Sequence, residues 1–570
     1  MSFNIELNNL VIAAEKGETI LAVLNRIGLN VPTLCFLKDL NPTGACRMCV
    51  VEVEGFNNLV TSCTQPVEEF MKIKTHSKRV LIARQTNLEL LLANHPDECL
   101  YCIRNRSCEL QHLAQNFQLN ERKFKSKKFN LKVDKSSSAL VKEPDKCILC
   151  GRCIRVCDEI QDIAALCFIK KGSNTTLGTT LNKPLSHSSC INCGQCIMVC
   201  PTAALHERNH IPQALEALEN PKKHTVVFHT SGVSFSIGEE FGFRSGKDVN
   251  GLLNSTLTKI GFHKVFDLGF ASDIYLMELA DDLMSRIQNR LILPLFSACC
   301  PSWIKFAEQY FPDILPSISR VKSPQQIMGS LIKTKYSKKL NIKPEDIFTI
   351  SAMPCIARKY EAQKENINHS NLIDVDCVLS TRELANLIKL KGSSLNDSFP
   401  QQSDNPFTEK SSADKLLCIS GGLIESLIRI LNYKITGKDI GELKLTKLRV
   451  SKGIKEFSIY IKKFEYHFAV VNGIGNARKL INDVLSGNKT YHFVEVMACK
   501  EGCINGGGQP LHFDKEVIKS RIKALYDSDE KDSNKFSYKN PSIPEFSEMF
   551  SNSEKEKILN TDYTERTVLK

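Results

Sequence analysis

Long apolar segments and a recognisable leader are both missing from this chain. In its 570 residues no stretch reaches the roughly 18 consecutive apolar residues that a membrane-spanning helix needs. The N-terminal segment, MSFNIELNNL, has neither a basic region with an apolar core nor an Arg- and Ser-rich amphipathic pattern. We therefore expect a cytoplasmic protein without a membrane span.

Concentrated charge and a nucleotide-binding glycine motif are missing as well. The formal net charge is +12, but the Lys residues are spread along the sequence and mixed with acidic residues, which is typical of a solvated surface. This pattern argues against nucleic-acid binding and allows only a weak basic face for an acidic redox partner. We interpret the basic run from Arg122 to Lys128 as a linker.

Cysteine, in contrast, is abundant, with 23 residues. A secreted protein held by that many disulfides would be short, and this chain is long. In a reducing compartment, clustered cysteines indicate metal ligands, and their spacing then indicates which metal.

The strongest pattern is C-x2-C-x2-C-x3-C, which occurs twice. In two-cluster ferredoxins each such run gives three ligands to one 4Fe–4S cube and its fourth cysteine to the other. Structural zinc does not explain a doubled run, and Pro201 follows the second run as the ferredoxin pattern expects. We predict one cube on Cys147, Cys150, Cys153 and Cys200, and a second on Cys190, Cys193, Cys196 and Cys157.

Two further groups of ligand-type residues precede these runs. The first, spaced C-x10-C-x2-C-x13-C in a β-rich region, predicts a 2Fe–2S cluster, with zinc as the alternative. The second, spaced H-x3-C-x2-C-x5-C, could hold either zinc or a His-ligated 4Fe–4S cluster. Its place between two electron-carrying modules favours iron, because zinc would interrupt a row of clusters. The two groups are Cys35, Cys46, Cys49 and Cys63, and His95, Cys99, Cys102 and Cys108.

The second half of the chain has cysteines without a local C-x2-C. They lie in SACCPSW (Cys299, Cys300), AMPCIARKYE (Cys355) and MACKEGCINGGGQP (Cys499, Cys503). The first two segments follow apolar strands, so their thiols are expected at strand ends that face a common crevice. A single cysteine at such a place is more often a small buried apolar residue, and we interpret Cys167, Cys377 and Cys418 in that way.

The pattern of apolar residues indicates several domains. Short β-like runs surround one helical stretch near the N-terminus, and beyond Thr225 apolar strands such as TVVFHT, KVFDLGF, LILPLFSA, DIFTISAMP and DVDCVLS alternate with helices, which is typical of α/β architecture. The polar segment from Gly392 to Asp414 is predicted to be a surface loop. The predicted domains are a plant-ferredoxin-like β-grasp domain (1–80), a His/Cys cluster domain (81–125), a two-cluster ferredoxin domain (126–209), a catalytic α/β domain (210–526) and a C-terminal strap or tail (527–570).

Together with VKSPQQ (Val321 to Gln326), DVDCVLSTREL (Asp374 to Leu384) and SGGLIES (Ser420 to Ser426), the cysteine segments resemble those of the iron-only (FeFe) hydrogenases. The resemblance is to the clostridial-type monomeric form with four accessory clusters and covers nearly the whole chain. It implies a two-lobed catalytic domain that holds the H-cluster between its lobes. This cofactor is a 4Fe–4S cube joined through one cysteine sulfur to a two-iron unit with CO, cyanide and azadithiolate. By matching positions, Cys300, Cys355, Cys499 and Cys503 would hold the cube, and Cys503 would bridge to the two-iron unit.

The resemblance also implies a reaction, which is the reversible interconversion of H2 with two protons and two electrons. Cys299 would exchange protons with the azadithiolate amine, because a thiol has a pKa close enough to neutral to give and take a proton. Pro324, Gln325, Met353 and Met497 would line the pocket around the diatomic ligands. Electrons would pass through the accessory clusters to or from ferredoxin or flavodoxin, and dedicated maturation proteins would load the two-iron unit.

The sequence departs from the family along the proton route, which runs from the cysteine to a glutamate, a serine, a second glutamate and an arginine. Leu279 occupies the first glutamate position and Asp282 the second, whereas Ser319 and Arg286 are kept. Positions 279, 282 and 286 share one helical face, and leucine cannot relay a proton. Glu278 points about 100° away on an ideal helix. We predict an altered path that uses water or Asp282, with slowed or biased turnover.

Three more departures lie near the cofactor. Ala298 stands where the family motif has serine, and Leu417 stands where phenylalanine is common. Arg358 replaces the lysine that meets a cyanide ligand; it keeps the charge but is planar and always protonated.

Three alternative functions remain. A hydrogen-sensing or low-activity relative would share the departures, although sensors usually carry a signalling domain that is not visible here. The non-enzymatic cytosolic iron–sulfur assembly factor shares the cube-ligand region but does not bind the two-iron unit. The large iron–sulfur subunit of respiratory complex I resembles only the first part of the chain. We expect a monomeric hydrogenase.

Overall fold

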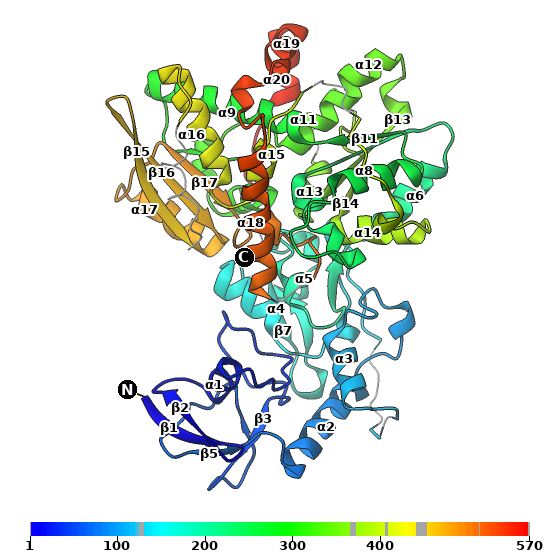
Figure 1. Ribbon diagram of the computed structural model, residues 1–570, viewed down its shortest axis with the longest axis vertical. Coiled ribbons are helices and arrows are strands. Elements are labelled where there is room, and N and C mark those ends of the chain that lie inside the picture. The colour runs from blue at the N-terminus through cyan, green and yellow to red at the C-terminus, as the bar shows by residue number, and fades with distance from the viewer. Residues whose placement is uncertain are drawn as a thin grey trace.

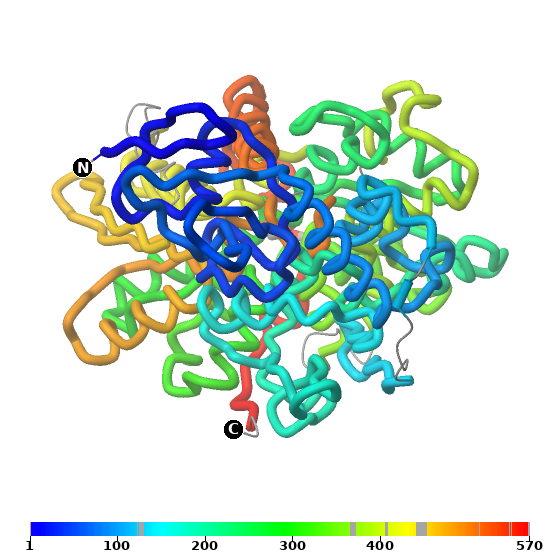
Figure 2. Tube along the Cα trace, turned by 90° about the horizontal axis from the view of Figure 1, so that it is seen from below, coloured from blue at the N-terminus to red at the C-terminus, as the bar shows by residue number. Residues whose placement is uncertain are grey.

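The computed structural model describes residues 2–121, 123–124, 130–364, 372–404, 409–440, 453–511 and 514–567. The molecule is elongated, with the N-terminal domains at one end and, at the other, the large region that was predicted to be catalytic and is called the catalytic region below (Figure 1). Seen along the long axis, the N-terminal domains lie in front of the catalytic region (Figure 2). Within these ranges, no helix combines the length and the apolar character that crossing a membrane requires. The basic run from Arg122 to Lys128 lies, apart from residues 123 and 124, outside the described residues.

The N-terminal domain is a five-stranded sheet in the order β2-β1-β5-β3-β4, packed against one helix. Successive side chains of a strand point to opposite faces of the sheet, so Ile5 and Leu7 of β1 both face a core that also contains Ile20 and Leu24 of the helix. The side chain of Thr19 caps this helix by accepting a hydrogen bond from the N–H of Ala22. The elements are β1 (Ser2–Leu7), β2 (Leu10–Glu15), α1 (Ile20–Arg26), β3 (Val50–Val53), β4 (Val60–Thr61) and β5 (Lys72–Lys74).

The next two regions are small and contain loops rich in cysteine. Two helices, α2 (Lys78–Ala93) and α3 (Glu109–Asn116), flank the His95 to Cys108 segment. The region that follows has two two-stranded sheets, which pair β6 with β9 and β7 with β8. Its elements are β6 (Leu140–Lys142), α4 (Arg152–Arg155), β7 (Leu166–Ile169), β8 (Thr176–Thr179), α5 (Gln195–Val199) and β9 (Leu205–Glu207).

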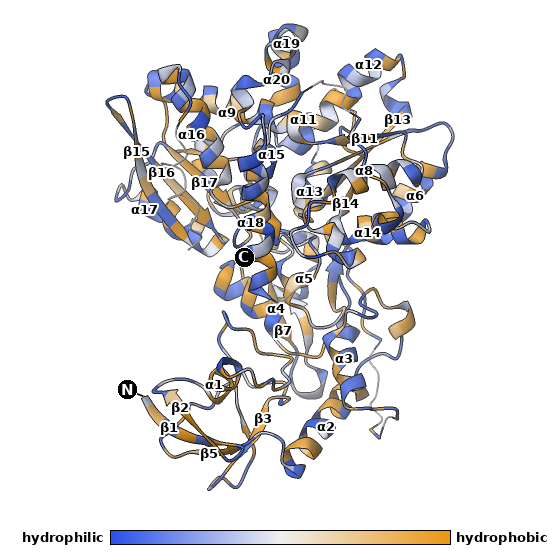
Figure 3. Ribbon diagram, in the orientation of Figure 1, coloured by the Kyte–Doolittle hydropathy of each residue, from blue (hydrophilic) through white to orange (hydrophobic). Residues whose placement is uncertain are grey.

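The catalytic region is built on two four-stranded sheets that lie side by side (Figure 1). The first sheet has the order β11-β10-β13-β14 and is parallel throughout. The second has the order β12-β17-β16-β15, in which only β15 is antiparallel to its neighbour. Apolar residues are concentrated along β16 and β17 (Figure 3). The strands are β10 (His224–His229), β11 (Lys264–Asp267), β12 (Leu295–Phe296), β13 (Ile347–Met353), β14 (Cys377–Ser380), β15 (Ile454–Ile461), β16 (Phe464–Asn472) and β17 (Phe493–Met497).

Helices cover both sheets and fill the space between them. The 20-residue helix α9 (Gly269–Gln288) contributes more buried residues than any other described helix and packs against α11 and α16. The other helices are α6 (Ile211–Glu219), α7 (Ser231–Ser234), α8 (Asn250–Lys259), α10 (Pro301–Tyr310), α11 (Pro324–Leu331), α12 (Ser337–Leu340), α13 (Ala357–Ala362), α14 (Thr381–Leu390), α15 (Ala413–Leu417), α16 (Gly422–Thr436), α17 (Ile474–Leu485), α18 (Lys515–Lys531), α19 (Ser542–Met549) and α20 (Asn552–Leu559).

Some predicted elements differ from the structure. The strand predicted from KVFDLGF ends at Asp267, and α9 begins two residues later. The segment LILPLFSA forms only the two-residue strand β12. The predicted surface loop from Gly392 to Asp414 is partly internal, because Leu395 and Ser411 are buried and Ser411 bonds Asp273 of α9; residues 405–408 of this loop lie outside the described residues.

The C-terminal segment runs back across the catalytic region. Helix α18 passes through the predicted domain boundary at residue 526. Beyond α20 the backbone bonds the catalytic region at three points: the N–H of Lys322 donates to the carbonyl of Leu559 (2.6 Å), that of Thr561 to Arg320 (2.8 Å), and that of Arg566 to Glu308 (2.8 Å). The described end of the chain is therefore fixed on α10 and on the start of α11.

Candidate metal centres and active site

The four N-terminal cysteines converge in the buried core of their domain. The sulfur atoms of Cys49 and Cys63 are 3.4 Å apart, and the sulfur of Cys35 interacts with those of Cys46 and Cys63. All four side chains are buried. A compact group of four buried thiols fits a small cluster such as 2Fe–2S.

The second predicted ligand group borders a single cavity. His95, Cys99, Cys102 and Cys108 all line it. The ring Nδ1 of His95 lies 3.0 Å from the carbonyl oxygen of Pro96. Such a contact orients an imidazole that binds metal through its other nitrogen.

The doubled run folds into two loops of the same shape. Leu149 and Gly151 of the first have positive φ, and so do Asn192 and Gly194 at the equivalent places in the second. In both loops a backbone N–H points at the first sulfur, from Leu149 to Cys147 and from Asn192 to Cys190, at 3.4 Å each. N–H bonds to sulfur stabilise thiolate charge, which a cluster ligand carries.

The fourth cysteine of each run lies near the other loop. Cys157 lines one cavity together with Cys190, Cys193 and Cys196. In the set predicted for the first cube, the thiols are close enough to interact electrostatically, since Cys147, Cys150 and Cys200 all act on Cys153. Burial raises the pKa of Cys147, Cys150 and Cys157 to about 12. Buried thiols of this kind become thiolates when a metal centre supplies positive charge, so both sets fit iron–sulfur cubes.

The four cysteines predicted to hold the catalytic cube come from both sheets. Cys355 follows β13 of the first sheet, and the other three follow β12 and β17 of the second. Cys300, Cys355 and Cys499 all act electrostatically on Cys503. Burial raises the pKa of Cys355 to about 12, so this set too fits a metal centre that compensates thiolate charge.

The N-terminal thiols lie near one ferredoxin-type set, and the other ferredoxin-type set lies near the thiols predicted to hold the catalytic cube. Cys35 acts electrostatically on Cys150, and Cys193 acts on Cys499. The side chain of Gln195 in α5 donates a hydrogen bond to the sulfur of Cys499 at 3.2 Å. The arrangement is therefore continuous from the N-terminal domain to the catalytic region.

In the described part of the chain, no three His, Cys, Asp or Glu side chains meet closely enough to surround one metal ion.

Cys299 lies next to the catalytic thiols and beneath Arg358. One guanidinium nitrogen of Arg358 donates to the Cys299 carbonyl at 2.8 Å and lies 3.5 Å from its sulfur. The other bonds both carboxylate oxygens of Glu361, at 2.9 and 2.7 Å. Burial raises the pKa of Cys299 to about 11, and the nearby Arg358 charge opposes this rise.

The face of α9 that resembles the family's proton route is interrupted. The Asp282 carboxylate accepts hydrogen bonds from Arg286 (2.8 Å) and Ser319 (3.0 Å). One turn earlier Leu279 is fully buried in an apolar core. Glu278 faces Asp281, Lys434 and Lys555. Three of the predicted relay groups are thus joined through Asp282, and Leu279, one turn earlier on the same face of α9, provides no polar atom to extend this group.

The predicted pocket residues lie at the ends of β12, β13 and β17 and at the start of α11. Ala298, Met353 and Met497 are buried. The amide of Gln325 bonds Ser351 (2.8 Å) and Glu361 (3.1 Å), while Pro324 begins α11.

Two residues near Cys299 were not predicted from the sequence. The sulfur of Cys418, which we interpreted as a small apolar residue, lies 3.1 Å from the hydroxyl of Thr230, and Cys299 acts electrostatically on it. Tyr275, one turn before Leu279 on α9, is fully buried and interacts with Cys299 and Arg358. Both are brought there by packing between distant segments, which leaves no local signal.

Comparison with known families matches four parts of the chain. Residues 223–507 match the iron only hydrogenase large subunit, C-terminal domain. Residues 1–78 match a 2Fe-2S iron-sulfur cluster binding domain, residues 84–123 the NADH-ubiquinone oxidoreductase-G iron-sulfur binding region, and residues 138–206 the ferredoxin-like domain of NADH-quinone oxidoreductase subunit 3.

Individual proteins are similar over nearly the same length. The NADP-reducing hydrogenase subunit HndD of Solidesulfovibrio fructosivorans is 36% identical over 547 residues, which cover 94% of this chain and 93% of that protein. Iron hydrogenase 1 of Clostridium pasteurianum is also 36% identical over 547 residues, covering 94% and 95%. A solved [FeFe]-hydrogenase from Chlamydomonas reinhardtii aligns with a TM-score of 0.57 and 31% identity over 63% of this chain and 100% of its own. The chain therefore belongs to the iron-only (FeFe) hydrogenase family, as its cysteine segments predicted, and is an oxidoreductase with iron–sulfur domains.

Proposed function

We propose that this hydrogenase interconverts H2 with two protons and two electrons at an H-cluster held by Cys300, Cys355, Cys499 and Cys503. The observation that carries the proposal is the convergence of these thiols at strand ends of two different sheets, with Cys299 beside them. When bound, the two-iron unit supplies an open iron position and a bridging amine for splitting H2. The protein binds the cube, excludes water from it and holds a thiol at Cys299 that can exchange protons.

The test compares two cysteine variants in anaerobically matured protein. Cys503→Ser should abolish H2 turnover and the infrared bands of bound CO and cyanide, because it removes the proposed bridging sulfur. Cys167→Ser is the matched control; Cys167 lies on β7, outside every proposed ligand set, and its variant should retain both. Turnover and infrared bands that survive Cys503→Ser would contradict the assignment.

We propose that electrons travel through one 2Fe–2S cluster and three 4Fe–4S clusters, one of them ligated by His95. The order of the thiol sets supports this route, since Cys35 acts on Cys150, Cys196 on Cys153, and Cys193 on Cys499. Ala substitution of His95 should change the spectrum of one reduced 4Fe–4S cluster in electron paramagnetic resonance and leave the other signals intact.

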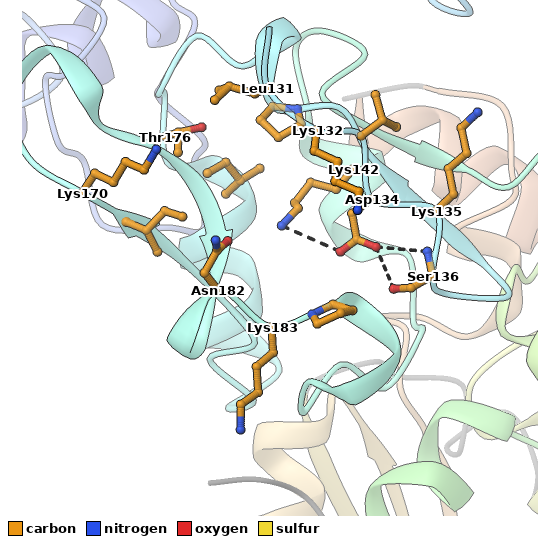
Figure 4. A pocket seen from close by; sticks show the side chains of 15 residues that line it. Leu131, Lys132, Asp134, Lys135, Ser136, Lys142, Lys170, Thr176, Asn182 and Lys183 are labelled. Carbon is orange, nitrogen blue, oxygen red and sulfur yellow. Dashed lines mark hydrogen bonds and ion pairs between the residues drawn. The ribbon is translucent and has the colours of Figure 1, made fainter. Parts of the chain in front are cut away.

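We propose that the external electron carrier is an acidic protein of the ferredoxin or flavodoxin type. A cavity of about 600 Å³ in the ferredoxin-type region is surrounded by Lys132, Lys135, Lys142, Lys170 and Lys183 (Figure 4). Asp134 pairs with the buried Lys142, 3.9 Å away, which leaves the rim predominantly positive. Pro144, also in the wall, is three residues from Cys147, so a carrier bound here would be near a cube.

The carrier proposal predicts a selective loss of affinity. Lys132→Glu combined with Lys170→Glu should raise the KM for reduced ferredoxin several-fold and leave turnover with a small viologen dye unchanged. Lys463→Glu, at the turn between β15 and β16, is the control. An unaltered KM would instead favour electron delivery by partner subunits, as the name of the relative called an NADP-reducing hydrogenase subunit suggests for that protein.

We also propose that the proton path is atypical and that turnover is slowed or biased as a result. Leu279 supports this, because it places a buried apolar side chain one turn before the bonded group of Ser319, Asp282 and Arg286 on α9. A sensing role is the second candidate and would be favoured by very low turnover in fully matured protein. An assembly factor is less well supported, since it would need neither Cys299 nor the accessory clusters.

A further inference from the structure

Two buried arginines cross the junctions between neighbouring thiol sets. Arg155 ends α4, two residues after the predicted ligand Cys153, and Arg104 lies two residues after the predicted ligand Cys102. The exposed fraction is 9% for Arg155 and 4% for Arg104. Each side chain reaches from its own ligand loop or helix into the domain of another thiol set.

Arg155 holds the loop that contains Cys35. One guanidinium nitrogen donates to the carbonyl of Cys35 at 2.5 Å, and the other donates to the carbonyl of Asn41. Four residues further along the chain, the carboxylate of Glu159 accepts a hydrogen bond from the N–H of Asn41 at 3.0 Å. The segment that carries the ferredoxin-type ligands therefore fixes three backbone groups of the N-terminal domain.

Arg104 makes the corresponding contact at the junction with the His/Cys region. One of its nitrogens donates to the carbonyl of Cys200 at 2.6 Å and to that of Ile197 at 3.3 Å. The thiols of Cys200 and Cys108, one from each set, both act electrostatically on this guanidinium. The set predicted for the first cube is thus linked to two neighbouring sets, and each link includes one buried arginine.

Neither guanidinium group has a carboxylate as its partner. Among the described residues, both groups bond backbone carbonyls and neither forms an ion pair with Asp or Glu. The Nε of Arg155 is buried and has no hydrogen-bond partner in that part of the chain. Arginine stays protonated in proteins, and a buried charge without an opposite charge nearby is strongly unfavourable. Iron–sulfur clusters held by thiolates carry negative charge, so clusters in the adjoining sets would compensate both arginines.

We propose that Arg104 and Arg155 are positioning residues of the electron route: they hold the two peripheral cluster domains against the first cube, and their charges raise the reduction potentials of the clusters at each junction. This inference rests on the proposed accessory clusters and names residues that fix their arrangement. Reduction adds negative charge to a cluster, so a fixed positive charge nearby stabilises the reduced form. One electron passes between clusters at each step, and neither arginine gains or loses a proton.

The experiment separates the charge of Arg155 from the planar shape of its guanidinium group. Arg155→Met removes both, whereas Arg155→Lys keeps the charge but not the pair of fixed donors that bonds two carbonyls. Lys515→Met is the matched control, because it also removes one positive charge beside the same loop, where Lys515 forms an exposed ion pair with Asp39 at 2.9 Å. Iron content and melting temperature confirm that each variant is folded and carries its clusters. Arg104→Met tests the second junction independently.

The first readout is the midpoint potential of the 2Fe–2S cluster, followed by electron paramagnetic resonance during a redox titration. We expect the midpoint to shift downwards in Arg155→Met, to stay near its original value in Arg155→Lys, and to move least in Lys515→Met, where water screens the charge. The magnetic interaction between the reduced 2Fe–2S cluster and the neighbouring cube should weaken in Arg155→Met, because the two domains are held less firmly. Arg104→Met should shift the cluster assigned to His95 and leave the midpoint of the 2Fe–2S cluster unchanged.

The second readout does not depend on a cluster signal. Hydrogen–deuterium exchange of the segment around Asn41, measured by mass spectrometry, should accelerate at least about tenfold in both Arg155 variants, as expected when hydrogen bonds to a charged group are lost. Exchange that is unchanged in Arg155→Met would overturn the positioning role.

The potentials decide the role of the charge. A midpoint that is unchanged in Arg155→Met, or that falls as far in Arg155→Lys or Lys515→Met, would overturn it. If exchange accelerates as expected but the unaltered protein shows no 2Fe–2S signal, the proposed electron route fails, whereas the hold of Arg155 on the Cys35 loop stands.

Discussion

Leu279→Glu is the substitution that tests the altered proton path most directly. The new carboxyl would lie on the face of α9 that also carries Asp282 and Arg286. Leu279 is fully buried in an apolar core, so we expect the change to cost about 2–4 kcal/mol of stability, the price of burying a polar group. Burial and the nearby Asp282 charge would both raise the pKa of the new carboxyl.

The rate of H2 evolution per folded molecule should rise by more than the loss of stability lowers the amount of folded protein. A positioned acid or base commonly contributes about 10²- to 10⁴-fold to a proton-transfer step. If proton delivery limits turnover, we expect H2 evolution to rise about tenfold or more, with a pH profile that follows the new carboxyl.

The matched control is Leu279→Gln, which has the same size and a similar burial cost but cannot take up a proton. H2 evolution with a viologen dye, measured from pH 5 to 9 at equal iron content, separates the two variants. Equal turnover of Leu279→Glu and Leu279→Gln, with an unchanged pH profile, would refute the reasoning.

Two further predictions concern stability. Arg382→Met should lower the free energy of unfolding by about 3–5 kcal/mol, because it leaves the buried carboxylate of Glu207 without its partner at 2.8 Å. The guanidinium holds the pKa of this carboxylate at about 2. The double variant Arg382→Met with Glu207→Leu should recover most of the lost stability, measured by thermal unfolding. Burial raises the pKa of Glu495 from its ordinary 4.5 to about 7, so the fold favours the protonated carboxyl and loses stability as pH rises from 4.5 to 7, by up to about 3 kcal/mol. Glu495→Gln should therefore lose less melting temperature than the unaltered protein between pH 5 and pH 8, and parallel curves would contradict this sign.

Ligand groups defined by local spacing were the most predictable part of the molecule. A C-x2-C-x2-C loop positions its own thiols, because the spacing and the positive φ at Leu149 and Gly151 determine the local backbone. The strand that precedes Cys355 was also recognisable, whereas β17, which precedes Cys499, was not predicted. The role of each ligand stays a prediction until metal binding is measured.

Features that depend on distant contacts were not predictable. The antiparallel pair β15 and β16 was missed, although its two strands alternate apolar and polar residues. KVFDLGF was extended too far because apolar Leu268 and Phe270 suit a strand as well as the start of α9. The bond between Arg566 and Glu308 joins residues 258 positions apart, so no pattern in the sequence could place them together.

The hydrogen bond from Gln195 to the sulfur of Cys499 has a consequence for how this enzyme can be divided. A donor to a ligand sulfur stabilises the more negative, reduced cluster and so raises its reduction potential. Because the donor belongs to a ferredoxin helix, a truncated protein that begins after that helix would shift the midpoint of its catalytic cube downwards. On the proposed assignment of Cys499 as a ligand of the cube, the accessory part of the chain would thus influence the electronic environment of the catalytic cofactor as well as carry its electrons.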